Sequence, residues 1–154
     1  PQLRAQGSGR IINISSVYGF IPQPYMAAYV ASKHAVEGYS ESLDHEVREH
    51  GVRVLLVEPA NTNTGFDANM ARADTPLPVY AQHRHTFDEV MAGLIKDGDE
   101  PATVAKVIVA AATDPKPKLR YTAGPRAGRV STLRRIVPVR AFDKQIRKLN
   151  QLAS

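Results

Sequence analysis

The 154-residue chain contains no cysteine and no long hydrophobic run. Without cysteine it can form no disulfide, thiolate nucleophile or cysteine-based metal site, so any redox chemistry requires a bound cofactor. No apolar run reaches the roughly 18 residues that a membrane span needs, and the first ten residues lack the apolar core of a signal peptide. We therefore expect a cytoplasmic protein.

The charge of the chain is unevenly distributed. Between Arg126 and Lys148 there are eight basic residues and one acidic residue, a formal net charge of +7, whereas the rest of the chain carries −2. The 43% apolar and 23% charged residues are typical of a globular domain with its own core. Because the chain begins at Pro1 and a strand-like run follows within about ten residues, we expect a fragment of a larger protein.

The first third of the chain predicts a strand, a helix and a second strand. Residues 10–14 form a short β-rich run, and two prolines then exclude a helix until about residue 25. The helix-forming run continues to His50, where Gly51 supplies a stop. Residues 52–59 are apolar at all positions except Arg53 and Glu58, which suits a strand covered on both faces of a parallel sheet.

The rest of the chain predicts a long polar insertion, helices and one more strand. Apolar spacing predicts amphipathic helices around residues 87–95 and 104–112, and residues 118–124 predict a short strand. Phe142, Ile146 and Leu149 indicate a final basic amphipathic helix, whereas residues 44–49 are interpreted as a solvated helix face. This order predicts the closing half of a doubly wound α/β domain with about three parallel strands.

A tyrosine and a lysine stand four residues apart in the predicted helix. Tyr29 and Lys33 therefore share one face. A tyrosine has a pKa of about 10, so acting as a base near neutrality requires roughly 4 kcal/mol of electrostatic help. A neighbouring ammonium supplies part of this help, and such a pair suits proton transfer to an oxygen while a cofactor carries hydride. The same spacing is also common in ordinary surface pairs.

Two other polar clusters are predicted at the same edge of the sheet. Ser16 follows the first strand and stands 13 residues before Tyr29, and the sequence PANTNT follows the second strand at residues 59–64. In open α/β sheets, ligands bind at the carboxyl ends of the strands. The three clusters therefore predict one site.

Four stretches together resemble the carboxyl-terminal part of the short-chain dehydrogenase/reductase family: GRIINISSVYGF, YVASKHAVEGYSESL, GVRVLLVEPANTNTGF and RYTAGP. The resemblance implies a Rossmann-type fold whose first half is missing from this sequence. It divides the chain into a catalytic βαβ portion (1–66), a substrate lid (67–98) and closing helices, last strand and basic tail (99–154). It implies an enzyme that uses NAD or NADP to interconvert a small-molecule alcohol and its carbonyl compound.

The resemblance also assigns roles to individual residues. Tyr29 is the general acid/base, Lys33 lowers its pKa and binds the nicotinamide ribose, and Ser16 rather than Ser15 orients the substrate oxygen. The segment that meets the nicotinamide carboxamide contains Pro59, Thr62 and Thr64. Ala60 replaces the usual glycine of this segment, which would strain the turn if the position needed a positive φ.

The resemblance leaves gaps and implies a class of substrate. The family's glycine-rich loop and catalytic asparagine are absent, so we expect the chain by itself to bind a dinucleotide poorly and to be inactive. No metal is expected. The sequence after the lid resembles the branch that includes steroid and retinol dehydrogenases, and an apolar lid with Phe66, Met70, Leu77 and Tyr80 favours a lipophilic substrate.

Other hypotheses remain open at this stage. The first interpretation of the basic tail is solvated surface charge. As a binding module it suits an anionic membrane surface better than nucleic acid, because it has no aromatic stacking platform and no DNA-binding motif. The chain could instead be a non-catalytic remnant. The helix at 29–50 resembles one that pairs in family dimers, so the complete protein is a candidate homo-oligomer.

Overall fold

The fold is built on a parallel sheet. In the computed structural model, which describes residues 1–66, 69–70 and 74–152, the strands lie in the order β1–β2–β3 and both neighbouring pairs are parallel. The strands are β1 (Gly9–Ile14), β2 (Val52–Pro59) and β3 (Arg120–Ala123). The expected α/β fold with about three parallel strands is confirmed.

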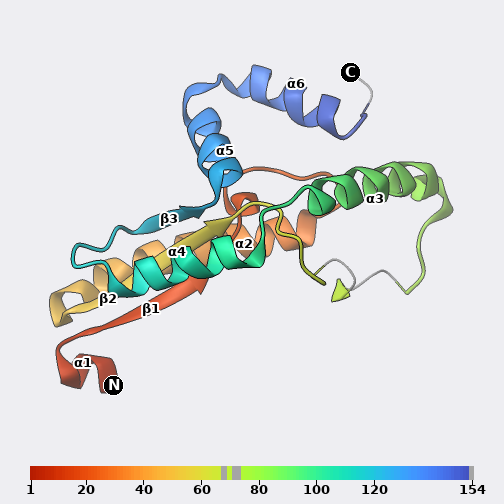
Figure 1. The fold of residues 1–154 in the computed structure, drawn as a ribbon. Helices are drawn as coiled ribbons and strands as arrows, with labels where there is room; N and C mark the ends of the chain where they lie inside the picture. Colours follow the sequence, from red (N-terminus) through yellow and green to blue (C-terminus); the bar gives the residue numbers. More distant parts are fainter. Residues whose placement is uncertain (67–68, 71–73, 153–154) are drawn as a thin grey trace.

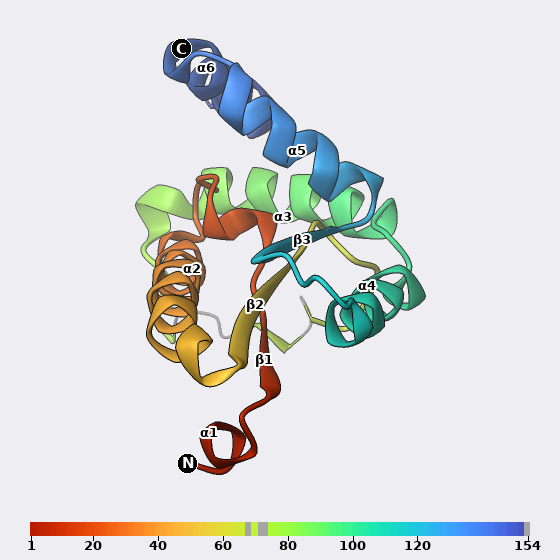
Figure 2. The ribbon, with the colours of Figure 1, turned by 90° about the vertical axis from the view of Figure 1, so that its left-hand side faces the viewer.

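Helices cover both faces of this sheet. The helices of the described residues are α1 (Gln2–Gln6), α2 (Ala27–Val47), α3 (Ala81–Lys96), α4 (Pro101–Thr113), α5 (Pro125–Ile136) and α6 (Val139–Leu149), with short 3₁₀ turns η1 (Val17–Gly19), η2 (Arg48–His50) and η4 (Pro78–Tyr80). Figure 2 shows α2 and α4 on opposite faces of the sheet and α3 across the carboxyl ends of the strands. In Figure 1, α5 and α6 extend away from the sheet beyond β3.

The boundaries of α2 follow from the residues that flank it. The loop with Pro22 and Pro24 delays its start to Ala27, slightly later than the sequence predicts. At the other end, η2 leads into Gly51, which has a left-handed φ of 71° as expected for a C-terminal stop. A Cβ at Gly51 would also collide with the carbonyl of Gly7, so this position needs glycine for space as well as conformation.

The centre of the core is β2. Residues 54–57 are completely buried, which confirms that both faces of this strand are covered. By contrast, β1 pairs within the described sheet only with β2, and Ile11 and Ile14 are 36% and 43% exposed. Arg10 donates hydrogen bonds from β1 to the carbonyls of Ala111 and Asp114 at the end of α4.

No helix of the described residues is long and apolar enough to cross a membrane.

The interpretation of residues 44–49 as a solvated face is wrong for Asp44. This side chain is fully buried and accepts hydrogen bonds from Arg48, from Arg53 Nε (2.9 Å) and from the amide of Val54 (2.8 Å). Burial alone would raise the pKa of Asp44, but the bonds from Arg53, Val54 and Arg48 outweigh it and lower the pKa to about 2. Helical spacing could not show this, because the partners lie on the following strand and turn.

We expect Asp44→Ala to lower the free energy of unfolding by about 3 kcal/mol, because two arginines and a buried amide lose their acceptor. Since the folded-state pKa is depressed, the stabilisation is present above pH 3.8 and is lost as the pH falls through about 2. Urea unfolding at neutral pH measures the loss. Glu46→Gln, an exposed change on the same helix, is the control. Equal free energies of unfolding for Asp44→Ala and Glu46→Gln would contradict a stabilising role for the buried Asp44 carboxylate.

Candidate active site

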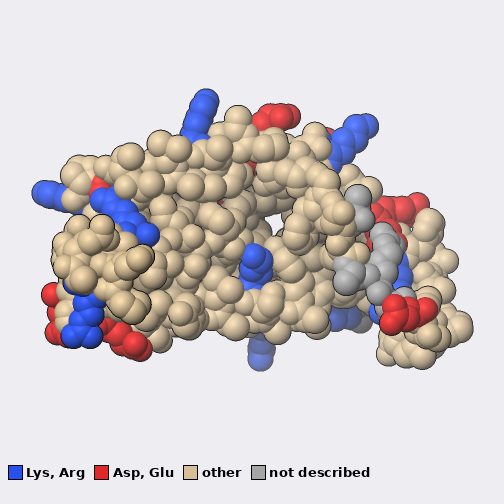
Figure 3. All heavy atoms as spheres, turned by 90° about the horizontal axis from the view of Figure 1, so that it is seen from below, with Lys and Arg blue, Asp and Glu red and all other residues tan. Residues whose placement is uncertain are grey.

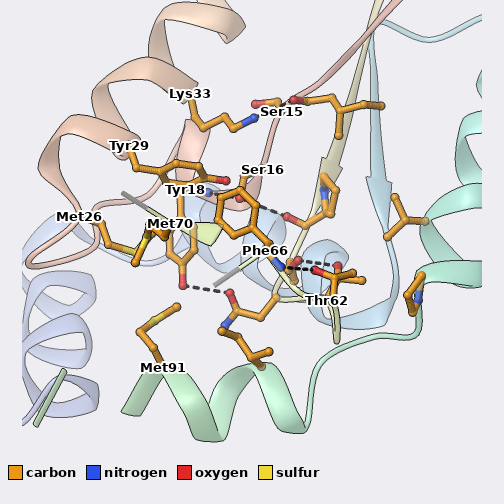
Figure 4. Close-up of a pocket in the computed structure, with 18 of the residues that line it drawn as sticks. Ser15, Ser16, Tyr18, Met26, Tyr29, Lys33, Thr62, Phe66, Met70 and Met91 are labelled. Carbon is orange, nitrogen blue, oxygen red and sulfur yellow. Dashed lines mark hydrogen bonds between the residues drawn. The ribbon is translucent and has the colours of Figure 1, made fainter. Parts of the chain in front are cut away.

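A cavity of about 400 Å³ opens at the carboxyl ends of the strands. Figure 4 shows side chains from α2, α3 and the loops after β1 and β2 pointing into it. Its lining includes every residue that the sequence assigns to the site: Ser16, Tyr29, Lys33, Pro59, Thr62 and Thr64. The face drawn in Figure 3 is hollowed in its middle, with a basic side chain beside the hollow.

Ser16 is positioned by the turn that follows β1. It is the N-cap of η1, and its hydroxyl accepts a hydrogen bond from the amide of Tyr18 at 3.2 Å. The hydroxyl also donates to the carbonyl of Pro59 at 3.4 Å, which ties the end of β1 to the end of β2. The side chain is thereby held at the cavity wall, which it shares with Tyr29.

Tyr29 projects from the first turns of α2 into the cavity (Figure 4). Its ring packs edge-on against Tyr18, with 6.2 Å between the ring centroids. The centroids of the Tyr29 and Phe66 rings are 5.6 Å apart. Burial raises the pKa of Tyr29 above its ordinary value, and the hydrogen bond with Ser16 offsets part of this rise. Ionisation of this phenol therefore needs further positive charge.

Lys33 lies one helical turn beyond Tyr29. Its ammonium donates a hydrogen bond to the carbonyl of Ile14 at 2.9 Å and lies 5.6 Å from the centre of the Tyr29 ring. Burial lowers the pKa of Lys33, whereas the negative charge of Glu37 raises it in part. Lys33 does not bring the pKa of Tyr29 below its ordinary value in this structure, so the lowering that the resemblance implies stays a prediction for the complete site.

Ser15 is also part of the cavity wall. It is buried, its amide bonds the carbonyl of Val57 at 2.8 Å, and its hydroxyl has no hydrogen-bond partner among the described residues. A Cβ at Gly19 would lie 2.7 Å from this hydroxyl and 2.8 Å from Cγ of Glu37, so the turn requires glycine here. The resemblance assigns the substrate oxygen to Ser16 rather than Ser15, whereas both serines line the cavity.

The segment after β2 is fixed by a second chain segment. Asp99 donates its amide to Asn61 O at 2.9 Å and accepts from the amide of Asn63 at 3.0 Å. The hydroxyl of Thr62 donates to the carbonyl of Ala60 at 3.1 Å. Ala60 is not among the residues with a positive φ, so alanine causes no strain of the kind considered from the sequence.

The sequence did not identify several residues of the cavity. Tyr18 is buried and its hydroxyl hydrogen-bonds Asn61 Oδ1 at 3.2 Å, which closes one wall beside Tyr29. Met91 and Ile95 of α3 complete the apolar side. The periodicity of α3 predicts an apolar face but does not distinguish a face that packs in a core from one that lines a cavity.

The predicted lid contributes part of the wall. Phe66 and Met70 line the cavity, whereas Leu77 and Tyr80 are 61% and 46% exposed and do not belong to its lining. Residues 67–68 and 71–73, which fall in or beside this part of the lid, lie outside the described residues.

A cluster of charged side chains, in which Glu58 and Glu37 are buried, links α2, β2 and β3. Glu58 of β2 is 1% exposed, and Arg120 of β3 contacts it at 3.3 Å, Glu37 at 3.2 Å and Glu41 at 3.1 Å. Burial and the nearby Glu37 raise the pKa of Glu58 to about 7, against the lowering effect of Arg120 and Arg135.

This cluster should make stability depend on pH. Because the folded-state pKa of Glu58 is raised, its favourable contribution is complete below pH 4.5 and is lost as the pH rises through about 7. The loss amounts to about 3 kcal/mol. We expect Glu58→Gln to remove this part of the pH dependence, measured by urea unfolding at pH 5 and pH 8. The same pH dependence in both proteins would contradict the burial of a protonated carboxyl.

Fold and site together define a class of protein: a parallel α/β domain with a serine, a tyrosine and a lysine at one cavity beyond the strands. The family model for short chain dehydrogenase matches residues 1–75. The oxidoreductase YbbO of Escherichia coli K12, whose own function is uncharacterised, is 36% identical over 144 residues, which span 94% of this chain and 50% of that protein. A 3-ketodihydrosphingosine reductase of Bacteroides thetaiotaomicron is 51% identical over 69 residues, 45% of this chain and 26% of that protein.

Solved structures give the same result. A short-chain dehydrogenase from Streptomyces avermitilis is similar with a TM-score of 0.72 and 31% identity, over 98% of this chain and 55% of that one. A short-chain dehydrogenase/reductase from Burkholderia phymatum, solved in complex with NAD, has a TM-score of 0.69 and 26% identity over 92% of this chain and 50% of that one. The chain belongs to the short-chain dehydrogenase/reductase family of oxidoreductases. It spans about half the length of the relatives that it matches.

Proposed function

We propose that this chain carries the acid/base half of a nicotinamide-dependent oxidoreductase that interconverts an alcohol and a carbonyl compound. The observation that carries the proposal is the meeting of Ser16, Tyr29 and Lys33 at one cavity. The three residues come from the turn after β1 and from α2. Ser16 is held by a hydrogen bond to the carbonyl of Pro59, and Lys33 by one to the carbonyl of Ile14. Such fixed geometry is what proton transfer to a bound substrate requires.

Each residue has a distinct role in this proposal. Tyr29 gives its phenolic proton to a carbonyl oxygen in reduction, or takes a proton from an alcohol in oxidation. Ser16 hydrogen-bonds the same oxygen and orients it beside the phenol. Lys33 places a positive charge 5.6 Å from the ring and so favours the phenolate as the proton leaves.

The residues present fit one end of a dinucleotide. Lys33 and Tyr29 would hold the ribose next to the nicotinamide, and Pro59, Thr62 and Thr64 would hold its carboxamide, because all five line one cavity. When bound, NAD or NADP supplies or accepts the hydride. Gly7 precedes β1 and Gly9 begins it, so neither follows a strand and they offer no pyrophosphate turn. We therefore infer that the 154-residue chain is inactive alone.

A lipophilic substrate is proposed because the cavity wall is mainly apolar. Lys33 is the only charged side chain among the described residues that line it, and three methionines face the same space: Met26, Met70 and Met91. The relative named as a 3-ketodihydrosphingosine reductase supports a substrate with a long hydrocarbon chain. Methionine side chains adapt well to flexible apolar ligands.

The experiment uses this chain together with the segment encoded directly upstream of it, which we call the extended protein. We expect it to oxidise NADH or NADPH in the presence of a panel of ketones and aldehydes, and Ser16→Ala to lower the rate. Turnover by the extended protein and none by the 154-residue chain supports the proposal. If neither the extended protein nor the 154-residue chain turns over any tested combination of cofactor and carbonyl compound, the proposal is contradicted and the non-catalytic alternative is favoured.

The substrate class makes a separate prediction. For straight-chain ketones of increasing length, kcat/KM should rise by about fourfold for each added methylene until the cavity is filled, since burying a CH₂ is worth about 0.8 kcal/mol. Met91→Gln should flatten this dependence, whereas Leu77→Gln, an exposed change outside the cavity, should leave it unchanged. A rate that is independent of chain length would contradict a lipophilic substrate.

A further inference from the structure

The corner between α5 and α6, residues 133–140, exposes large aliphatic side chains. Ile136 is 70% exposed, Val139 is 72% exposed and Leu133 is 42% exposed. Figure 1 shows that α5 rises from the end of β3 and turns into α6 at a distance from the sheet. The aliphatic side chains therefore stand at a protruding part of the molecule rather than beside a core that could cover them.

Exposed basic residues surround this corner. They are distributed along both helices: Arg126, Arg129, Arg135, Arg140, Lys144 and Lys148. The segment from Arg126 to Lys148 contains a single acidic residue, Asp143, and so carries +7, against −2 for the rest of the chain. The surface therefore complements a dense array of negative charge.

Individual side-chain contacts join the two helices to the rest of the protein. Arg134 Nε donates to the carbonyl of Phe20 at 3.1 Å and its guanidinium lies 5.2 Å from the ring centre of Phe142. At the other end of α6, buried Asn150 accepts a hydrogen bond from Gln23 at 2.6 Å. The inner side of α6 is thus occupied by contacts with the loop after β1, and Ile136 and Val139 remain exposed in this anchored arrangement.

We propose that the α5–α6 corner is a docking surface for membranes that contain anionic lipids. Aliphatic side chains enter the boundary between headgroups and acyl chains, while neighbouring arginines bind phosphate groups and keep their charges in water. Nucleic acid offers no site for exposed isoleucine and valine, and this corner has no aromatic residue on which a base could stack. Anionic lipid therefore suits both the aliphatic and the basic side chains of this corner. Docking does not depend on the proposed oxidoreductase activity.

Insertion of the corner can be measured directly. The chain has no tryptophan, so Ile136→Trp introduces a single tryptophan whose emission can be excited selectively, and Val109→Trp, at an exposed position of α4, is its matched control. With vesicles of phosphatidylglycerol and phosphatidylcholine in equal amounts, we expect blue-shifted emission for Ile136→Trp and none for Val109→Trp. Equal shifts, or no shift for Ile136→Trp, would overturn the proposal.

The charges are tested by sedimentation of the unlabelled chain with the same vesicles. Arg135→Gln combined with Arg140→Gln should lower the partition coefficient by roughly 30-fold, because each basic residue near an anionic surface contributes about fivefold. Lys106→Gln combined with Lys116→Gln removes two exposed charges elsewhere and should have little effect. Far-UV circular dichroism checks that all variants keep the same fold. Equal losses in both pairs, or tighter binding to duplex DNA than to vesicles, would overturn the assignment to lipid.

Discussion

Replacing Tyr29 with phenylalanine is expected to lower the turnover number of the extended protein by about 10²–10⁴-fold, the range for removal of a general acid/base. The substitution removes only the hydroxyl, and the packing of the ring against Tyr18 and Phe66 is kept. Stability should therefore change little. Initial rates with saturating cofactor and carbonyl substrate measure the effect.

The matched control for this prediction is Tyr39→Phe. Tyr39 lies on the same helix but is 62% exposed and outside the cavity lining, so the loss of its hydroxyl should not affect turnover. Full activity of Tyr29→Phe would show that another group transfers the proton. Equal losses in the two variants would point to a general disturbance of α2 instead.

Replacing Lys33 with glutamine is expected to lower kcat/KM by about 10²–10³-fold, the range for removal of one preorganised electrostatic contact at a reacting oxygen. A positive charge near the ring stabilises the phenolate, and its loss should move the pH at which Tyr29 ionises upward. In the oxidation direction, the alkaline rise of the rate should therefore shift to higher pH. Burial already raises the pKa of Tyr29 above its ordinary value, and loss of the Lys33 charge should raise it further.

The pH profile separates an electrostatic role from a structural one. Lys33 also holds the end of β1 through the carbonyl of Ile14, and loss of this bond alone would lower the rate without moving the profile. Lys33→Arg keeps the charge and should retain the wild-type position of the alkaline limb. An unchanged limb in Lys33→Gln would contradict the proposed effect on the phenol.

Much of the fold could be predicted because its signals are local. The apolar run at β2, the prolines before α2 and the glycine after it each act within a few residues. Two helices were missed. The helix α1 has only five residues, and α5 mixes glycine, serine, threonine and arginine without a clear apolar face, so its contacts with β3 and η1 stabilise it instead.

The site could be predicted in part for the same reason. Ser16, Tyr29 and Lys33 stand within 18 consecutive residues, and their spacing places them on one edge of the sheet. The wall opposite them comes from α3, far along the chain, and only the folded structure brings Met91 to that side. The buried Asp44 and Glu58 were also out of reach, because their arginine partners belong to other strands and turns.

The most direct test of the central claim is a titration of the extended protein and of the 154-residue chain with NADH and NADPH, followed by nicotinamide fluorescence. If Ser16, Tyr29 and Lys33 form the nicotinamide end of a site that other residues complete, the extended protein binds one or both nucleotides, Lys33→Gln binds more weakly, and the short chain does not bind measurably. Binding by the short chain as tight as that of the extended protein, or binding that is unaffected by Lys33→Gln, would contradict this account.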